Sequence, residues 1–176
     1  GLIMSVFQKE FKVETKEKAV SYVDITQSVK DTILESGIQS GTCTVVTAHT
    51  TCSIFFEEDT HDRDEDGVDF LQLDLNRILE SIVPPHINAQ SYNYPGEAHY
   101  KEVESWPNPE EWLPNGDRSY LWNGDAHIKA TIIGASETLA VVDGQLGIGK
   151  TGYVYFADFD KTRERTRKYR VIVLGE

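Results

Sequence analysis

Three chemically active side chains lie within five positions near the middle of the second half of the chain. Asp125, His127 and Lys129 alternate with small residues, and Ser136 follows shortly after. An imidazole transfers protons near neutral pH, and an ammonium beside it can bind a phosphate group. Because small residues pack closely, the pattern favours a site built into a wall of the fold. The competing interpretation is a half-buried segment whose charges face water.

A second imidazole occurs at His49, in His49-Thr50-Thr51, between two strand-like segments. A single histidine at a strand end usually has a hydrogen-bonded structural role. If the fold brings His49 close to His127, two imidazoles with a carboxylate could hold a divalent metal. The remaining histidines fall in acidic or loop-like regions, so we expect them at the surface: His61, His86 and His99.

Residues 144–151, Gly-Gln-Leu-Gly-Ile-Gly-Lys-Thr, match the phosphate-loop pattern of nucleotide-binding proteins. That chemistry requires a helix beginning at Lys150, whose amides and dipole face the phosphates. The residues that follow, 152–156, are strand-like instead. The pattern therefore favours a glycine-rich turn within a hairpin, where Lys150 can still meet an anion.

The composition fits one folded domain over residues 1–176. The chain is 39% hydrophobic and has a net charge of −12, which argues against nucleic acid or an anionic membrane as the main partner. No apolar run approaches the length of a membrane span, and no signal peptide is visible, so we expect a cytoplasmic protein. Cys43 and Cys52 lie in apolar, strand-like surroundings and are expected to be inert buried thiols.

Apolar alternation and β-branched residues predict strands at residues 6–13, 41–48, 52–56, 138–142, 153–156 and 168–174. A helix is expected at 27–36, and another where apolar residues recur from Val68 to Ile82. Residues 160–165 are expected to form a charged hairpin turn. The proline-rich stretch from about 86 to 120 predicts a long ordered loop insertion that packs through its aromatic side chains. Together these features predict an α+β fold, a compact antiparallel β-sandwich with two main helices.

Several motifs in this order resemble the YjbQ family, whose members are described as secondary thiamine-phosphate synthases. They are His49-Thr50-Thr51, the acidic end of the next strand, Ala126-His127-Ile128-Lys129-Ala130 with Gly134-Ala135-Ser136, the glycine turn at 144–149, and a closing basic strand. The resemblance covers nearly the full chain. Its most specific part is the Ala-His-Ile-Lys-Ala segment.

The resemblance implies a YjbQ-like fold assembled as a homotrimer, with sites near the subunit boundary that include His49, His127 and Lys129. It also implies a weak ability to join a pyrimidine pyrophosphate to a thiazole phosphate, with release of pyrophosphate. Two features depart from the family. The usual Gly-Thr-Trp-Gln after the glycine turn is replaced by Gly149-Lys150-Thr151-Gly152, and the insertion is longer.

Our leading hypothesis is therefore a small enzyme that acts on a phosphorylated metabolite. Lys129 and Lys150 would neutralise charge on the departing pyrophosphate, assisted by Mg²⁺. His127 or His49 would transfer a proton or ligate a transition metal, and Asp125 would orient an imidazole. Phosphate oxygens would be bound by Thr50, Thr51, Ser136 and Gly149. No organic cofactor is expected. The alternative is a non-catalytic trimer that binds a metabolite, an anion or a metal with the same residues.

Overall fold

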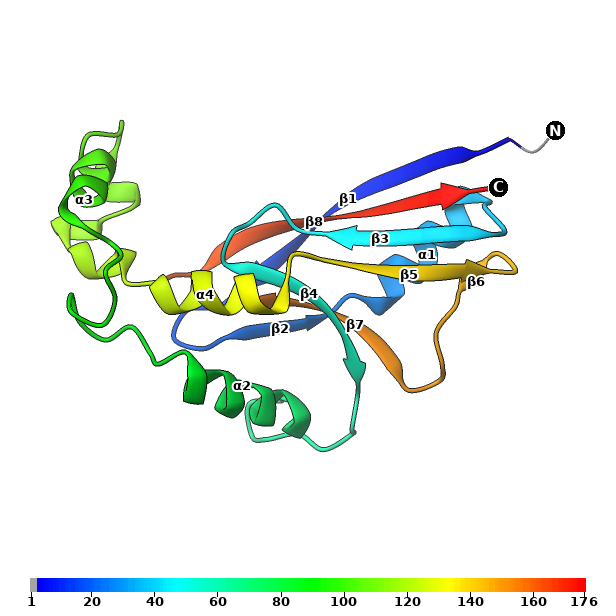
Figure 1. Ribbon diagram of the computed structural model, residues 1–176, viewed down its shortest axis with the longest axis horizontal. Coiled ribbons are helices and arrows are strands. Elements are labelled where there is room, and N and C mark those ends of the chain that lie inside the picture. Colours follow the sequence, from blue (N-terminus) through cyan, green and yellow to red (C-terminus); the bar gives the residue numbers. More distant parts are fainter. Residues whose placement is uncertain (1–2) are drawn as a thin grey trace.

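Two antiparallel sheets form the body of the molecule (Figure 1), as described for residues 3–176 by a computed structural model. The larger sheet has the strand order β1-β8-β3-β5-β6, and the smaller has the order β2-β7-β4. Their bounds are β1 Ser5–Thr15, β2 Ser21–Asp24, β3 Gly41–Val46, β4 Cys52–Glu58, β5 Ser136–Val142, β6 Gln145–Leu146, β7 Gly152–Asp158 and β8 Arg165–Gly175. All six predicted strands are present, and the short β2 and β6 are additional.

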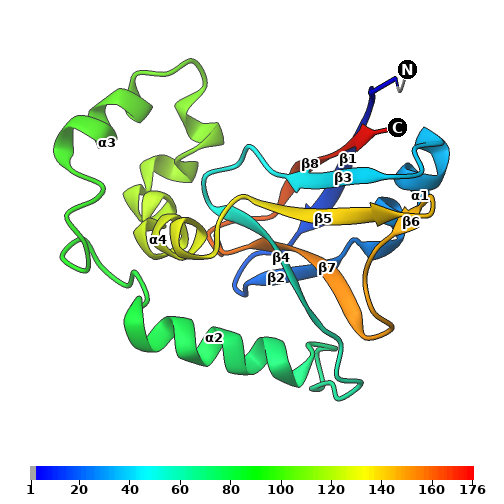
Figure 2. The ribbon, with the colours of Figure 1, turned by 45° about the vertical axis from the view of Figure 1, so that its right-hand side comes forward.

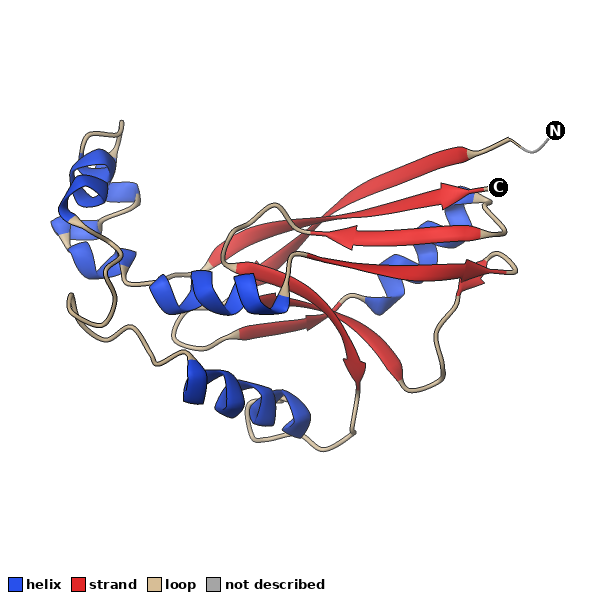
Figure 3. Cartoon of the chain, in the orientation of Figure 1, coloured by secondary structure: helices blue, strands red, loops and turns tan. Residues whose placement is uncertain are grey.

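Four α-helices accompany the sheets (Figure 3): α1 Thr26–Ser36, α2 Phe70–Ile82, α3 Glu97–Glu104 and α4 Gly124–Ile133. The first two are the helices that the sequence predicted. The helix α4 contains the Asp125 to Lys129 motif, and α3 lies within the expected loop. The α+β class with antiparallel sheets is confirmed, with two more helices than expected.

The main core lies between the two sheets and under α1. In β7, Val154 and Phe156 point into this core, whereas Tyr155 and Ala157 point to the opposite face. This alternation follows from the two-residue period of a strand. Apolar side chains of α2 and α4 cover the outer face of the smaller sheet, and Figure 2 shows α2 below that sheet and α4 beside β4. The helix α4 is thus positioned by packing against the smaller sheet.

Two connections expected to be hairpin turns instead cross from one sheet to the other. Residues 159–164 lead from β7 in the smaller sheet to β8 in the larger sheet, and residues 147–151 lead from β6 to β7. The hairpin in this region is formed at Asp143 and Gly144, which both have positive φ and join β5 to β6. Such turns match the twist of the paired strands. The hairpin predicted at 160–165 was wrong, and the one predicted at the glycine turn is present only at Gly144, because local turn residues do not reveal which sheet the next strand joins.

Residues 86–120 are more regular than a loop. Besides α3 they contain short 3₁₀ helices at Pro109–Glu111 and Pro114–Gly116, with a further one at Arg118–Leu121 overlapping their end. A small apolar cluster of Tyr100, Val103, Leu113 and Leu121 holds them together. Arg118 lies over the Tyr100 ring and forms ion pairs with acids at both ends of α3. Residues 86–120 therefore form a helical unit, where the sequence predicted a loop.

The two cysteines are buried free thiols on β3 and β4, which belong to different sheets. Burial raises the pKa of Cys43 to about 11 and that of Cys52 to about 12. Both therefore remain protonated and unreactive near neutral pH. Over residues 3–176, no helix has the length and apolar character needed to cross a membrane.

Candidate functional site

The helix α4 divides the three side chains of the central motif between two faces. Residues four apart lie on the same face of a helix, and residues two apart point in nearly opposite directions. Asp125 and Lys129 accordingly both point inward, with exposed fractions of 5% and 1%. His127 is half-buried on another face. The motif therefore lies in a wall of the fold, with Asp125 and Lys129 on the inner side and His127 on another side.

Lys129 is buried without an ion pair. Among the lysines of residues 3–176, only Lys9 and Lys168 form ion pairs within 4.0 Å. Burial lowers the pKa of Lys129, and the charge of Asp125, one turn earlier, opposes that effect. A lysine side chain this buried without an ion pair is unusual, and ionisable groups with lowered or raised pKa values are enriched at functional sites. Lys129 is thus the strongest single indication of chemistry in the chain.

Asp125 contacts His86, and not the imidazole of its own motif. Its Oδ2 atom accepts a hydrogen bond from the His86 amide at 3.1 Å, and its Oδ1 atom accepts one from the Ala126 amide at 2.8 Å. The Nδ1 atom of His86 accepts a hydrogen bond from the Gly124 amide at 3.0 Å. The expectation that His86 lies at the surface is wrong, because these bonds and its stacking on Trp122 bury it.

His127 lines a cavity of about 460 Å³ together with Tyr92, Tyr94, Ile128 and neighbouring backbone. The Tyr94 ring meets the His127 ring edge-on, with centroids 5.3 Å apart. Burial lowers the pKa of His127, whereas Asp160 and a backbone hydrogen bond with Thr50 raise it. The insertion thus supplies aromatic walls to the same cavity as the motif histidine. Sequence reasoning missed both tyrosines, although Tyr92-Asn93-Tyr94-Pro95 concentrates aromatic residues.

Residues 47–51 connect β3 to β4. They contact His127 of α4 through Thr50, and they form hydrogen bonds with β8. The Nε2 atom of His49 accepts a hydrogen bond from the Lys168 amide at 2.9 Å, so that only Nδ1 is free for other contacts. Thr51 is buried, and its hydroxyl accepts a hydrogen bond from Arg167 at 2.9 Å. Burial lowers the pKa of His49, as does the nearby Arg167. His49 therefore has the hydrogen-bonded structural role that is usual for a histidine at a strand end. It also directly precedes Thr50, which contacts His127.

A buried ionic network lies between this segment and α4. Arg167 donates to Asp158 at 2.8 Å, and Arg165 forms an ion pair with Asp160 at 3.0 Å. Asn123 donates to Asp160 at 2.8 Å and accepts from the Tyr94 hydroxyl at 2.9 Å. The network links the first turn of α4, the insertion and the smaller sheet. In the sequence, this network corresponds to acids at 158 and 160 followed by arginines at 165 and 167. From the sequence alone, we interpreted this region only as a charged turn.

The structure does not bring the other predicted phosphate-binding residues to α4 within one chain. Ser136 is close in the fold, since β5 begins there opposite Val46, but its side chain is exposed to solvent. Gly149 and Lys150 precede β7, whereas Asp158 ends it. A strand of this length spans roughly 20 Å. Gly149 and Lys150 therefore lie at the far end of β7 from the ionic network.

His49 and His127 were the predicted metal ligands. Residues 3–176 contain no group of three or more His, Cys, Asp or Glu side chains placed to hold a metal ion. One nitrogen of His49 is already an acceptor for the Lys168 amide. The metal site at His49 and His127 therefore remains a prediction.

Comparison with known proteins identifies the family. The family model described as "UPF0047 protein YjbQ-like" matches residues 9–176. The chain belongs to the YjbQ-like UPF0047 family. The YjbQ-like relatives include a UPF0047 protein of Methanothermobacter thermautotrophicus, 27% identical over 100% of this chain and 97% of the relative. The UPF0047 protein YugU of Bacillus subtilis is 27% identical over 90% of this chain and 93% of its own length.

Solved structures of YjbQ-like proteins share the fold. A YbjQ-like protein of unknown function from Sulfolobus solfataricus has a TM-score of 0.69 and 24% identity, covering 99% of this chain and all of its own. An uncharacterized YjbQ/UPF0047 protein from Clostridium acetobutylicum has a TM-score of 0.65 and 26% identity, covering 94% of this chain and 98% of its own. The recognition of the YjbQ family from its motifs is thus confirmed over nearly the full chain.

Proposed function

We propose that this YjbQ-like protein is a small-metabolite transferase that joins a pyrimidine pyrophosphate to a thiazole phosphate at the α4 site. The observation that carries the proposal is the arrangement of the family motif on one helix. That helix presents His127 to an aromatic-lined cavity and buries Lys129 without an ion pair. An aromatic cavity suits planar heterocycles, and a free cation suits a leaving group that gains negative charge.

The reaction is a substitution at a benzyl-like carbon. The ring nitrogen of the thiazole forms a bond to the methylene carbon of the pyrimidine, while the bond from that carbon to the pyrophosphate oxygen breaks. The electron pair leaves with the pyrophosphate, and the thiazole nitrogen becomes the positive centre of thiamine phosphate. No net proton transfer is required. The main demands on the protein are alignment of the two rings and stabilisation of the departing oxygens.

The residues around α4 meet these demands in different ways. We assign a hydrogen bond to the departing oxygens to the neutral imidazole of His127, which lines the cavity. Lys129, buried on another face of α4, supplies positive charge to the site through space rather than by contact. Tyr92 and Tyr94 form walls on which a pyrimidine can stack. Asp125 and His86 are positioning residues, because their bonds to each other and to Gly124 fix the start of the helix.

Incubation with both thiamine precursors and Mg²⁺ tests the proposal through the release of pyrophosphate and the appearance of thiamine phosphate. Replacing His127 by Ala should lower kcat/KM by a factor on the order of 100 or more. Lys129→Met, which conserves the buried volume, should lower it by a factor on the order of 100. Lys12→Ala removes an exposed lysine on β1 and is the matched control. Unchanged turnover in both α4 variants, with intact folding, would refute the site.

A non-catalytic binding protein is the second candidate. Two observations favour it: Lys129 is only 1% exposed, and the Nε2 atom of His49 accepts a hydrogen bond from the Lys168 amide. On this account the same groups hold an anion and no bond is broken. Phosphate ligands would then raise the thermal midpoint, and this rise would be lost in Lys129→Met, while no pyrophosphate would appear from the precursors at any enzyme concentration.

We also propose a homotrimer working in the cytoplasm. Apolar side chains remain exposed on the helices that cover the smaller sheet, among them Ile82 on α2 and Ile132 on α4, with exposed fractions of 63% and 52%. Apolar surface of this kind is typical of contacts between subunits. The two free thiols suit a reducing compartment.

A further inference from the structure

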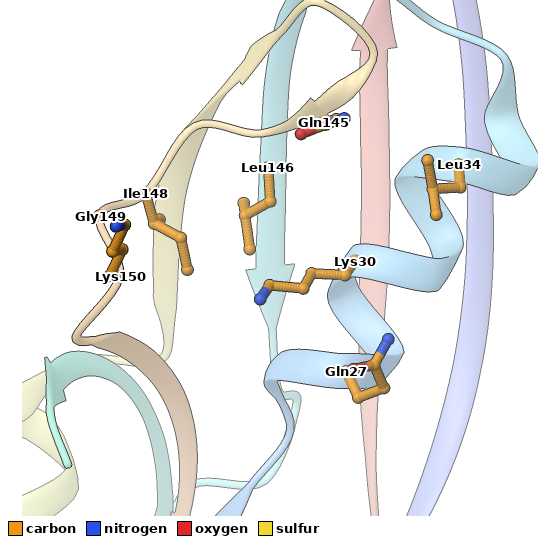
Figure 4. Close-up of a pocket in the computed structure, with 8 residues that line it drawn as sticks. All are labelled: Gln27, Lys30, Leu34, Gln145, Leu146, Ile148, Gly149 and Lys150. Atoms are coloured by element: carbon orange, nitrogen blue, oxygen red, sulfur yellow. The ribbon is translucent and has the colours of Figure 1, made fainter.

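A second cavity, of about 390 Å³, lies between α1 and the connection from β6 to β7 (Figure 4). Its volume is in the range of sites for small metabolites. The residues that line it are Gln27, Lys30, Leu34, Gln145, Leu146, Ile148, Gly149 and Lys150. It therefore contains the Gly149-Lys150 pair of the phosphate-loop-like motif, which the α4 site does not use.

The walls of this cavity combine an apolar surface with two ammonium groups. Leu146 and Ile148 point into the space between the two elements, and Lys30 reaches toward them from α1 (Figure 4). Leu146 belongs to the main core, and Ile148 packs against it, so this wall is rigid. Lys150 comes from the opposite wall to Lys30. A ligand with an apolar body and an anionic end matches both parts of the surface.

Both acidic side chains of α1 have a polar partner other than Lys30. Asp31 accepts a hydrogen bond from the side-chain amide of Gln27 at 2.8 Å, and Glu35 forms an ion pair with Lys9 at 3.0 Å. Of the lysines in residues 3–176, the ion pairs involve Lys9 and Lys168 alone. Lys30 and Lys150 thus form no ion pair within 4.0 Å among these residues, in a chain whose net charge is −12. Two cations facing one cavity in an acidic protein favour an external anion.

Gly149 leaves room beside these cations. A Cβ atom added to Gly149 would have no heavy atom within 4 Å, so that the backbone there borders open space. The cavity is also separate from the α4 site. Gly152 begins β7 and Asp158 ends it, at a separation of roughly 20 Å along the strand.

We propose that this cavity is a second ligand site that binds a small phosphate monoester with an aromatic or aliphatic body. Lys30 and Lys150 hold the phosphate, and Leu34, Leu146 and Ile148 contact the body. The proposal does not depend on the reaction assigned to α4, because it concerns different residues at the other end of the sandwich.

Methyl NMR on the full-length protein tests the proposal, with phenyl phosphate, inorganic phosphate and phenol as separate probes. Phenyl phosphate should shift the methyl signals of Leu34, Leu146 and Ile148 saturably, and should do so at lower concentration than inorganic phosphate. Phenol should cause no saturable shift at the same concentrations. The methyl signals of Ile132 and Ile133 on α4 report any separate binding there.

Variants decide whether the two lysines act together. Lys30→Gln and Lys150→Gln should each weaken phenyl phosphate binding by roughly fivefold, the value of one partly solvated ion pair, and the double variant should weaken it further. Lys12→Gln on β1 should leave it unchanged, and so should Lys129→Met. The proposal is overturned if no saturable shift occurs, if only the α4 methyl signals shift, or if Lys12→Gln weakens binding as much as Lys30→Gln.

Discussion

The carboxylate of Asp125 accepts a hydrogen bond from the backbone amide of His86 at 3.1 Å, across a separation of 39 residues. His86 returns the contact by accepting a hydrogen bond from Gly124. The first residue of the insertion and the first turn of α4 are therefore one unit. This unit places Tyr92 and Tyr94 against His127, so the insertion shapes the cavity of the family motif.

Stability should decrease as the pH falls from about 7.5 to about 5.5. Burial lowers the pKa of His86 below its ordinary value of 6.5, and it also lowers the pKa values of His49 and His127. The unfolded chain then binds protons that the folded chain does not, so protonation favours unfolding below pH 6.5. The stabilising contribution is fully present above pH 6.5 and is lost as the pH falls toward the lowered pKa values. Urea midpoints across this range measure it.

The variant His86→Gln keeps a hydrogen-bond acceptor but cannot titrate, so its urea midpoint should depend less on pH than that of the wild type. His61→Gln, at an exposed histidine, is the control and should keep the wild-type dependence. An unaltered pH dependence in His86→Gln would contradict the assignment.

Removing one partner of the Asp158–Arg167 pair should destabilise the fold strongly. The side chain of Asp158 is fully buried and that of Arg167 is 11% exposed, so each would leave an unpaired buried charge. We expect Arg167→Met to lower the free energy of unfolding by about 3–5 kcal/mol. Lys9→Met, at the exposed pair with Glu35, should cost less than about 1 kcal/mol. Chemical denaturation measures both, and equal losses would show that the buried network has no special role.

The protein should assemble as a trimer in solution. Light scattering coupled to gel filtration should give three times the chain mass of 19.9 kDa. Ile132→Asp places a charge on the exposed apolar side of α4 and should lower the mass in a concentration-dependent way. A wild-type mass equal to that of one chain, at micromolar concentration, would exclude the trimer.

The sequence predicted the elements that have a regular apolar period. The strands around Val45 and Val171 and the helix through Leu75 and Leu79 were identified because their apolar residues recur at two or at three to four positions. The helix α4 has no such period, since small residues surround its polar groups. Its burial was predicted from composition, but its helical state was not.

Long-range pairing explains most of what the sequence did not reveal. Nothing local indicates that Asp158 meets Arg167 across two sheets, or that His86 returns to the start of α4. The same limit applies to Lys150, which our hypothesis assigned to the same phosphate as Lys129, whereas the fold places it at the cavity that Lys30 also lines. Residue types and spacing identified the chemistry, and only the fold could assign each group to its cavity.

The central claim is that the α4 cavity holds the reacting groups, and a crystal structure of the protein soaked with pyrophosphate and thiazole phosphate tests it most directly. We predict density for the thiazole ring in the cavity lined by His127, and density for pyrophosphate in contact with the His127 imidazole. Ligand density found elsewhere, with the His127 cavity empty at saturating concentrations of both compounds, would contradict the account.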